Sequence, residues 1–218
     1  MAARWDLVVN LLLLLPLLLS ASSMVLKLDG NVYPTGHFYV TMHIGVPAKP
    51  YFLDIDTGSK VTWLECDAGG GSCQTCNKTP HPLYRPKRIN RVPCAHPLCD
   101  ALHRDLGTQK NCTEYPQQCD YGIKYLDGSW STGVLLQDKF SFSESQIAFG
   151  CGYEQGDNPG KEVPVDGILG LGKGSVDLVW YRSSRTTISS QRKWLAIASA
   201  QKEGATSLLG KSMCPLRS

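Results

Sequence analysis

Long apolar segments are almost absent from this sequence of 218 residues. Beyond residue 23, no stretch approaches the roughly 20 apolar residues that a membrane-spanning helix requires. No segment before Ser175 repeats its apolar residues at the 3.6-residue helical period over several turns. Long helices are therefore not expected, and the 21 Gly and 13 Pro residues predict many turns instead. With 42% hydrophobic and 19% charged residues, the chain is also not a wholly disordered protein.

A strong charge of one sign is absent from the main part of the chain. Residues 24–179 contain 14 basic and 17 acidic residues, whereas residues 180–218 contain seven basic residues and one acidic residue. The overall charge of +3 therefore comes from the tail, and we expect no nucleic-acid partner. We predict that this Ser-rich tail, 180–218, is a divergent and poorly ordered segment with one short helix around Gln191–Lys202.

The first 23 residues are typical of a secretory signal peptide. Arg4 supplies a positive charge, Leu7–Leu19 is the apolar region, and Ala21-Ser22-Ser23 offers small residues for cleavage. An apolar region of 13 residues is too short to span about 30 Å of hydrocarbon. We therefore expect residues 1–23 to direct the chain to the secretory pathway, with an extracellular or vacuolar destination and no membrane attachment after cleavage.

Eight of the nine cysteines lie within residues 66–151. They are Cys66, Cys73, Cys76, Cys94, Cys99, Cys112, Cys119 and Cys151. An even number of cysteines in an oxidising compartment predicts disulfide bonds, although on the order of a hundred pairings remain open. Cys73 and Cys76 have the spacing of zinc ligands, but no second C-x-x-C follows, so we expect no metal and no other cofactor. Two sequons, at Asn77 and Asn111, are candidates for N-glycosylation of a secreted glycoprotein.

Short apolar or alternating runs between turn residues fill the region from Gly36 to Val179 and predict an all-β fold. The predicted strands are His37–Ile44, Pro50–Ile55, Lys60–Leu64, Gly122–Leu126, Gly133–Gln137 and Gln146–Phe149. Asp127-Gly128 is a hairpin-turn signal between two of them. Residues 65–120 are rich in Cys and Pro and poor in periodicity, so we expect a disulfide-rich insertion there.

The segment Asp56-Thr57-Gly58-Ser59 places a carboxylate at the end of an apolar strand. Gly58 permits a sharp turn that brings its N–H toward the carboxylate, and the hydroxyl residues can donate further hydrogen bonds. Such a carboxylate becomes an effective catalyst when a second one about 3 Å away shares its proton. Two other interpretations remain open, namely an ordinary turn and a metal site formed with Asp54, which lies on the same face of the strand.

The context of this motif resembles the N-terminal lobe of the pepsin-like aspartic proteases. Trp63 follows the motif, and then come Tyr125-Leu-Asp-Gly-Ser129 and Asp166-Gly-Ile-Leu-Gly-Leu-Gly172. The cysteine-containing segments and the His-Pro-Leu-Tyr-Arg-Pro segment at 81–86 resemble the plant nucellin-like branch most closely. The resemblance covers about Val32–Val179, so we expect residues 24–179 to form one N-terminal lobe of a bilobal fold.

The resemblance implies roles for individual residues. Asp56 would be the first catalytic aspartate, supported by Thr57, Gly58 and Ser59. The flap that covers a bound peptide would carry Tyr125, Asp127, Gly128 and Ser129, and Trp63 would orient Tyr125. Ile168-Leu169-Gly170 would pack behind the active loop, and Asp54 would be a neighbour of the dyad instead of its second member. Lys60 departs from the Asp or Ser that the branch has after the motif, and it adds positive charge near Asp56.

A second Asp-Thr-Gly or Asp-Ser-Gly is absent from the sequence. The resemblance therefore implies a truncated aspartic-type endopeptidase that cleaves polypeptides, with one catalytic aspartate and no C-terminal lobe. Pairing with a second lobe or chain would complete the dyad. The alternative is a catalytically inactive secreted lobe that acts as a peptide-binding or regulatory decoy.

Overall fold

The computed structural model describes five stretches of the chain and two short strands in the tail. These are residues 25–31, 36–67, 79–143, 145–156 and 165–174, with 194–195 and 214–215. The predicted signal peptide, Cys73, Cys76, Asn77 and most of the tail lie outside the described residues. Within the described part of the chain, no helix is long and apolar enough to cross a bilayer.

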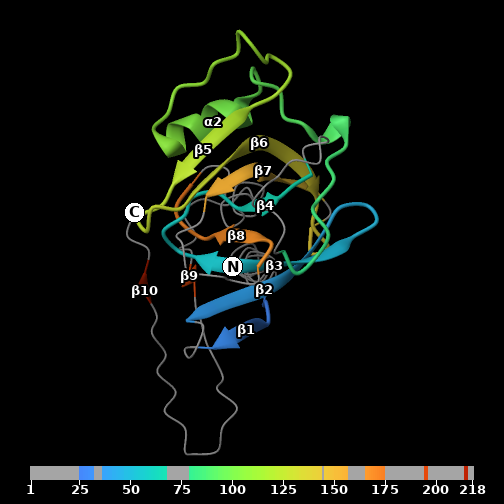
Figure 1. The fold of residues 1–218 in the computed structure, drawn as a ribbon, viewed down its shortest axis with the longest axis vertical. Coiled ribbons are helices and arrows are strands. Elements are labelled where there is room, and N and C mark those ends of the chain that lie inside the picture. The colour runs from blue at the N-terminus through green and yellow to red at the C-terminus, as the bar shows by residue number, and fades with distance from the viewer. Residues whose placement is uncertain are drawn as a thin grey trace, which may run out of the picture.

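One eight-stranded sheet carries the described chain (Figure 1), in the order β1-β2-β3-β8-β4-β7-β6-β5. The strands are β1 (Leu28–Asn31), β2 (His37–Ile44), β3 (Lys49–Asp56), β4 (Trp63–Glu65), β5 (Asp120–Lys124), β6 (Trp130–Lys139), β7 (Gln146–Gly156) and β8 (Gly167–Gly170). Only the β3–β8 and β4–β7 pairs of this sheet are parallel. The late strand β8 is thus inserted between two early strands, which places it next to the Asp56 end of β3.

The predicted strands are found, with shifted ends. The prediction for β2 is confirmed residue by residue, and β3 extends one residue beyond the prediction at each end. The strand predicted at Lys60–Leu64 is limited to Trp63–Glu65, because the residues before Trp63 form a loop held against the end of β8. The sequence pattern did not reveal β1, whose four residues include Asp29 and Gly30.

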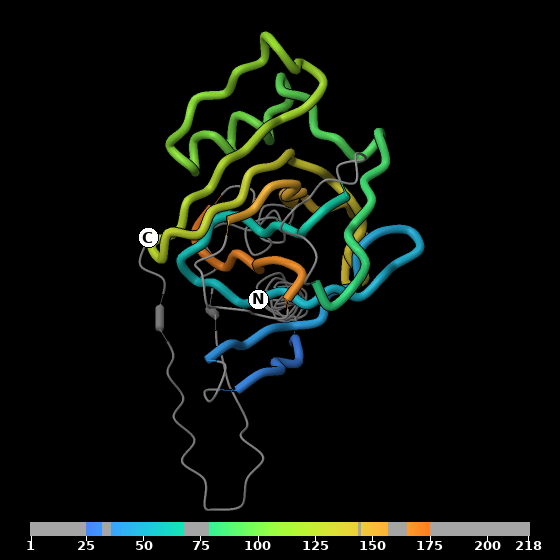
Figure 2. Tube along the Cα trace, in the orientation of Figure 1, coloured from blue at the N-terminus to red at the C-terminus, as the bar shows by residue number. Residues whose placement is uncertain are grey.

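The disulfide-rich insertion predicted at residues 65–120 contains a helix that the sequence pattern did not reveal. Helix α2 spans Pro97–Leu106 and lies at the top of the view in Figure 2, over the end of the sheet that contains β5 and β6. Its ends carry signals that periodicity alone does not detect: Pro97 at the first position and Gly107 in the left-handed conformation that ends the helix. Its apolar residues Leu98, Cys99, Leu102 and Leu106 follow the helical period, but over only ten residues, a run too short to count as sustained periodicity.

The helix predicted around Gln191–Lys202 is wrong at the two residues of that span that the structure describes. Strand β9 (Trp194–Leu195) pairs antiparallel with β10 (Cys214–Pro215). The remainder of the predicted helix lies outside the described residues.

Two hydrophobic clusters fill the lobe. The larger one lies among β2, β3, β6 and β7 and includes Met42, Leu53, Phe140, Phe149 and Leu169. The smaller one lies under α2 and the segment before β5 and includes Val61, Trp63, Leu102, Tyr121 and Leu135. Because Trp63 belongs to the second cluster and Leu169 to the first, the core supports both sides of the loop after β3.

Three disulfides join six cysteines of the described chain, all from the set for which disulfides are predicted. Cys66 pairs with Cys151, Cys94 with Cys112, and Cys99 with Cys119. The first links the segment after β4 to β7, and the other two hold the insertion that contains α2. The glycosylation candidate Asn111 lies on an exposed turn, where its Oδ1 accepts from the backbone N–H of Thr113 at 3.1 Å.

Several tyrosines are held in their neutral form by burial, so stability should fall in alkaline solution. Burial is the largest cause that raises the pKa of Tyr51, Tyr84, Tyr121, Tyr125 and Tyr153 above the ordinary value. The folded state thus keeps protons that the unfolded chain loses above about pH 10. This stabilisation is complete below that pH and is lost as the pH rises toward the raised values.

We expect the free energy of unfolding to fall above about pH 10, by about 1.4 kcal/mol per pH unit for each such tyrosine. Denaturant titrations between neutral and alkaline pH measure the slope of the unfolding free energy against pH. Tyr121→Phe removes one titrating group and should make the slope shallower. A slope that is the same in the variant would contradict the assignment.

Candidate functional site

Asp56 is the last residue of β3, and it lies beside β8 in parallel register with Gly170. Its backbone carbonyl accepts from the N–H of Leu171 at 2.8 Å. Its carboxylate oxygen Oδ1 accepts from the N–H of Gly58 at 2.8 Å, and the side chain is partly buried. The approach of the Gly58 N–H that the sequence predicts is therefore present in the structure.

The loop after Asp56 is fastened to the end of β8. The N–H of Gly172 donates to the Ser59 carbonyl at 2.8 Å, and the N–H of Gly170 donates to Thr62 Oγ1 at 3.2 Å. A Cβ on either glycine would lie 2.7 Å from backbone atoms of the loop. The close contact requires glycine at both positions, so the Ile168-Leu169-Gly170 segment lies directly against the active loop.

The hydroxyl residues of the motif differ in their surroundings. Thr57 is exposed, whereas Ser59 is buried and its Oγ donates to the carbonyl of Val61 at 3.2 Å. Lys60 points away from the carboxylate, because its Nζ donates to the carbonyl of Asp105 in the last turn of α2 at 2.8 Å. The Lys60 ammonium thus satisfies a carbonyl at the negative end of this helix.

The turn Tyr125–Ser129 joins β5 to β6 and is the segment for which the resemblance predicts a flap, so we call it the flap. The carboxylate of Asp127 accepts from the N–H of Ser129 at 3.0 Å and from its hydroxyl at 2.6 Å. Gly128 has φ +89°, a conformation that favours glycine. The Asp127-Gly128 turn signal is thus correct, and the connection that contains it is longer than a two-residue turn.

Tyr125 and Trp63 join the flap to the loop after Asp56. Trp63 Nε1 donates to the hydroxyl of Tyr125 at 2.7 Å. Burial raises the pKa of Tyr125, while hydrogen bonds with Ser59 and Trp63 act in the opposite direction and the charge of Asp56 adds to the rise. The hydroxyl is therefore neutral in acid and neutral solution, and it lies near enough to Asp56 to sense its charge.

A Trp63→Phe variant should loosen the flap without unfolding the lobe. A phenyl ring still fills most of the indole's space in the core, but the hydrogen bond to Tyr125 is lost, which lowers the free energy of unfolding by about 1 kcal/mol beyond the cost of the smaller ring. Hydrogen–deuterium exchange should show faster exchange at the N–H groups of residues 125–129. The Tyr125→Phe variant removes the same bond, so the double variant should lose little more than either single one. Fully additive losses would show that the two side chains are not coupled.

Asp54 is paired with a histidine. Its Oδ2 lies 3.0 Å from Nδ1 of His37 on the neighbouring strand β2. Among the described residues, the one group with three potential metal ligands is Cys99, His103 and Cys119, and its two cysteines form a disulfide. Asp54 and Asp56 therefore belong to no group of three neighbouring potential metal ligands in the described part of the chain.

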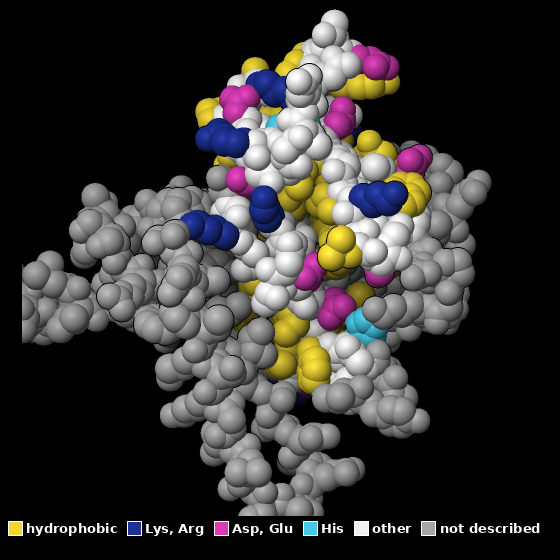
Figure 3. Space-filling model, turned by 90° about the vertical axis from the view of Figure 1, so that its left-hand side faces the viewer, with side chains coloured by type: hydrophobic (Ala, Val, Ile, Leu, Met, Phe, Trp, Pro, Cys, Tyr) yellow, Lys and Arg dark blue, Asp and Glu magenta, His cyan; other side chains and the backbone are white. Residues whose placement is uncertain are grey.

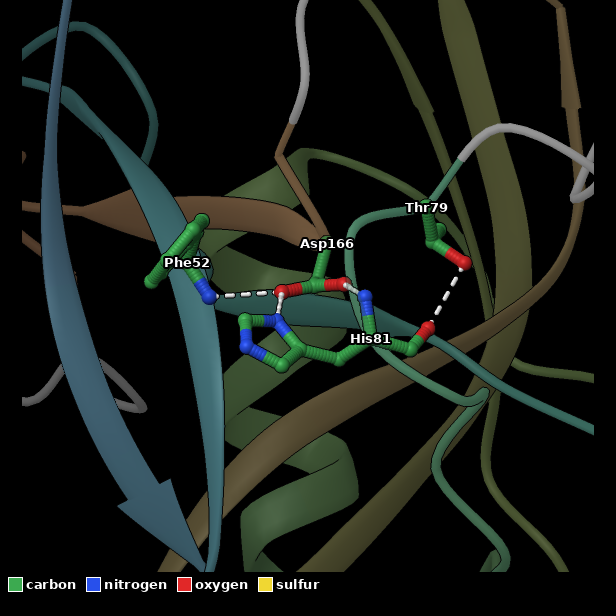
Figure 4. A network of polar contacts seen from close by, with 4 residues as sticks. All are labelled: Phe52, Thr79, His81 and Asp166. Atoms are coloured by element: carbon green, nitrogen blue, oxygen red, sulfur yellow. Dashed lines mark hydrogen bonds and ion pairs between the residues drawn. The ribbon is translucent and has the colours of Figure 1, made fainter.

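Figure 4 shows a buried carboxylate whose importance sequence reasoning missed. Asp166 precedes β8, and its side chain is 3% exposed. Its Oδ2 accepts from the backbone N–H of Phe52 at 2.6 Å and lies 2.7 Å from the ring Nδ1 of His81. The backbone N–H of His81 donates to the other carboxylate oxygen, Oδ1, at 3.1 Å. The backbone N–H of Asp166 also donates to the Phe52 carbonyl at 2.7 Å. Asp166 thus fixes the start of β8 beside β3, four residues before the contact with Asp56.

A signal for this network exists in the sequence, but its partners cannot be read from it. An aspartate directly before the apolar run of β8 is a candidate for burial, and a buried carboxylate needs hydrogen-bond donors. The partners Phe52 and His81 are 114 and 85 residues away along the chain. Only the folded sheet brings them together.

The surface on the Asp56 side combines apolar side chains with charges of both signs. Figure 3 looks at the left-hand side of Figure 1, toward which β3 runs, and shows hydrophobic side chains down the middle of the described surface with acidic and basic side chains around them. Leu126, at the flap, is fully exposed, and Trp130 is 39% exposed. This side of the lobe thus combines a carboxylate, a neutral phenol and exposed apolar side chains.

The family described as "Xylanase inhibitor N-terminal" matches residues 38–207 of this chain. The match continues beyond Val179, where the sequence resemblance is predicted to end, and the division of the chain at that residue stays a prediction. The match covers more than half of the chain and includes every described residue of the site, from Asp56 to Gly172.

Several plant proteins are similar in sequence. An aspartic proteinase of Oryza sativa subsp. japonica is 49% identical over 99% of this chain and 52% of its own length. Its counterpart of the same name from subsp. indica is 51% identical over 87% of this chain and 47% of its own length. "Aspartyl protease family protein At5g10770" of Arabidopsis thaliana is 33% identical over 66% of this chain and 30% of its own length. The chain thus spans about half the length of the two rice relatives.

A solved structure, conglutin gamma, "a unique basic 7S globulin from lupine seeds", covers 73% of this chain and 42% of its own. Its TM-score is 0.49 and its sequence identity is 17%.

Proposed function

Because this chain belongs to the pepsin-like aspartic protease family, whose N-terminal lobe it matches, we propose that it provides one half of the active site of an aspartic-type endopeptidase. The observation that supports this proposal best is the setting of Asp56. Its carboxylate accepts from the Gly58 N–H, in a loop joined through Trp63 to the flap tyrosine Tyr125.

The proposed mechanism needs two carboxylates about 3 Å apart that share one proton. One removes a proton from a water molecule, which attacks the peptide carbonyl, and the other donates a proton toward the carbonyl oxygen. In this scheme Asp56 is one of the two, and Thr57, Gly58 and Ser59 support its loop. The flap residues Tyr125–Ser129 close over the polypeptide and keep bulk water away from the reacting bond.

The second aspartate is proposed to come from a second lobe. The 218 residues contain one Asp-Thr-Gly and no Asp-Ser-Gly. A second lobe of a longer protein, a separate partner lobe or a second copy of this chain would each bring a carboxylate to face Asp56. We further propose maturation in the secretory pathway, which the predicted signal peptide and the three disulfides support.

The test measures cleavage of a denatured protein between about pH 3 and 5, where a carboxyl pair can share a proton. One arm uses the chain alone over a range of concentrations, and the other mixes it with the C-terminal half of the japonica rice relative. We expect cleavage that pepstatin inhibits in at least one arm. A rate that rises with the square of concentration in the first arm identifies a second copy as the source of the carboxylate.

Asp56→Asn should reduce the rate by about three orders of magnitude. Asp54→Asn is the matched control, because it neutralises a carboxylate on the same strand that is already paired with His37, and it should keep most of the activity. Activity that survives in Asp56→Asn would refute the proposal, as would the absence of cleavage in both arms from folded protein. Peptide binding without cleavage in both arms would favour the decoy function.

A further inference from the structure

The end of the sheet opposite Asp56 carries a basic surface. We define it by six exposed cations and two exposed aliphatic side chains: Lys49, Arg85, Lys87, Arg88, Arg91 and Lys139, with Val46 and Ile89. The turn between β2 and β3 and the segment 84–91 both lie on the right of Figure 1, whereas β3 runs toward the left. Lys49 begins β3 and Asp56 ends it, about 23 Å away along the strand.

Contacts between distant segments bring these residues to one place. Lys87 Nζ donates to the carbonyl of Val46 at 3.1 Å, and the N–H of Gly45 donates to the carbonyl of Lys139 at 2.8 Å. The buried Asn90 attaches the short 3-10 helix η2 (Arg88–Asn90) to β6 through a 2.7 Å hydrogen bond to the Gln137 carbonyl. Because Asn90 is buried, the two preceding side chains of η2, Arg88 and Ile89, project into solvent.

The charges of the described residues are unevenly distributed. Segments 45–49, 84–91 and 138–140 contain six basic residues and one acidic residue, Asp138. The other described residues contain six basic and twelve acidic residues. Asp138 is buried and accepts from the Tyr84 hydroxyl, so its carboxylate does not cover the surface. Half of the described basic residues are thus concentrated at one end of a lobe that is otherwise acidic.

Most of these cations are available to a partner. Arg85 pairs with Asp67, and Lys87 is bound to a backbone carbonyl. Lys49, Arg88, Arg91 and Lys139 are exposed and have no acidic partner among the described residues. Ile89 is 88% exposed and Val46 is 57% exposed, which makes them two of the six large hydrophobic residues exposed in the described chain. Apolar side chains flanked by charges are the arrangement found in protein interfaces.

We propose that this basic surface binds an acidic polypeptide segment that carries aliphatic side chains among its carboxylates. The exposed apolar residues are aliphatic, whereas single-stranded nucleic acids are held by stacking on aromatic side chains. Residues 180–218 of this chain are not the partner, because seven basic residues and one acidic residue make that tail repel the surface. The binding does not depend on Asp56 and holds whether or not the proposed proteolytic function is correct.

The test uses the full mature chain and a fluorescently labelled synthetic peptide of Glu-Glu-Leu repeats, with binding measured by anisotropy at neutral pH. Affinity should fall as salt is added. It should also fall below about pH 4, where the glutamates of the peptide become protonated. Arg88→Glu with Arg91→Glu should weaken binding about tenfold, because two attractions become repulsions. Ile89→Ser should weaken it about threefold by removing the apolar contact.

The matched control is Lys27→Glu with Lys124→Glu, which reverses two exposed cations elsewhere and should leave the affinity unchanged. Equal weakening in this control would overturn the proposal in favour of general charge attraction. Tighter binding to polygalacturonate or to phosphatidylserine vesicles, with the same dependence on Arg88 and Arg91, would overturn it in favour of another class of partner. The absence of peptide binding to folded protein would also refute it. Asp56→Asn should bind the peptide normally, which separates this result from the test of proteolysis.

Discussion

Asp166→Ala should lower the free energy of unfolding by about 3 to 5 kcal/mol, because it removes the buried acceptor of two backbone N–H groups, and each donor left unpaired costs about 1 to 3 kcal/mol. The substitution leaves the N–H groups of Phe52 and His81 without their acceptor. Both hydrogen bonds are partly buried and point at a carboxylate in the core, so water cannot fully replace the lost acceptor. Denaturant titration at neutral pH measures the loss.

Asp127→Ala is the matched control for this prediction. Asp127 also accepts two hydrogen bonds, both from Ser129, but it is exposed in the flap. Water can replace the carboxylate there, and we expect a loss of about 1 kcal/mol or less. If the two variants lose similar amounts, burial is not what makes Asp166 important.

Gly167→Ala should destabilise the lobe by about 3 kcal/mol, because the new methyl group has no space. A Cβ at this position would lie 2.1 Å from the carbonyl oxygen of Trp63 and 2.9 Å from the Cα of Leu64. Both contacts are with backbone atoms of β4, which cannot rotate away as a side chain can. Strand β8 would have to move out of its place between β3 and β4.

Gly122→Ala provides the control on an outer strand. Its Cβ would contact only the methyl group of Thr132 at 3.7 Å, an ordinary van der Waals distance. We expect a change within about 1 kcal/mol, which can be stabilising because alanine reduces the freedom of the unfolded chain. Thermal melts of the two variants provide the comparison. Equal melting temperatures would show that the sheet can shift to accept a side chain at Gly167.

Both substitutions act on the site through β8. Asp166 and Gly167 begin this strand, and Gly170, Leu171 and Gly172 at its other end hold the loop that follows Asp56. If the proposed function is correct, a folded variant with a displaced β8 should lose activity although Asp56 is intact. The position of the carboxylate thus depends on residues more than 100 positions later in the sequence.

Local patterns predicted the elements of this lobe well where one face of a strand is buried. β2 was predicted at its observed ends, because its apolar residues alternate between turn residues. The Asp56 motif, the flap turn and the pairing of Trp63 with Tyr125 follow from short motifs and their family resemblance. Helix α2 does not stand out in the sequence, because its helical pattern of Leu98, Leu102 and Leu106 extends over only ten residues within a Cys- and Pro-rich segment.

The sequence by itself determined that this is a β-rich lobe with one Asp-Thr-Gly at the end of an apolar strand, since periodicity and turn chemistry are local properties. It also determined the charge of each segment, but it did not show that basic residues from distant segments gather at one end of the sheet. Tertiary structure decided which cysteines pair, that Asp54 pairs with His37, and that Asp166 ties β8 to β3. These features depend on contacts between residues far apart in the chain, and such contacts are set by the order of strands in the sheet. That order places β8 beside Asp56 and leaves the basic surface at the opposite end of β3.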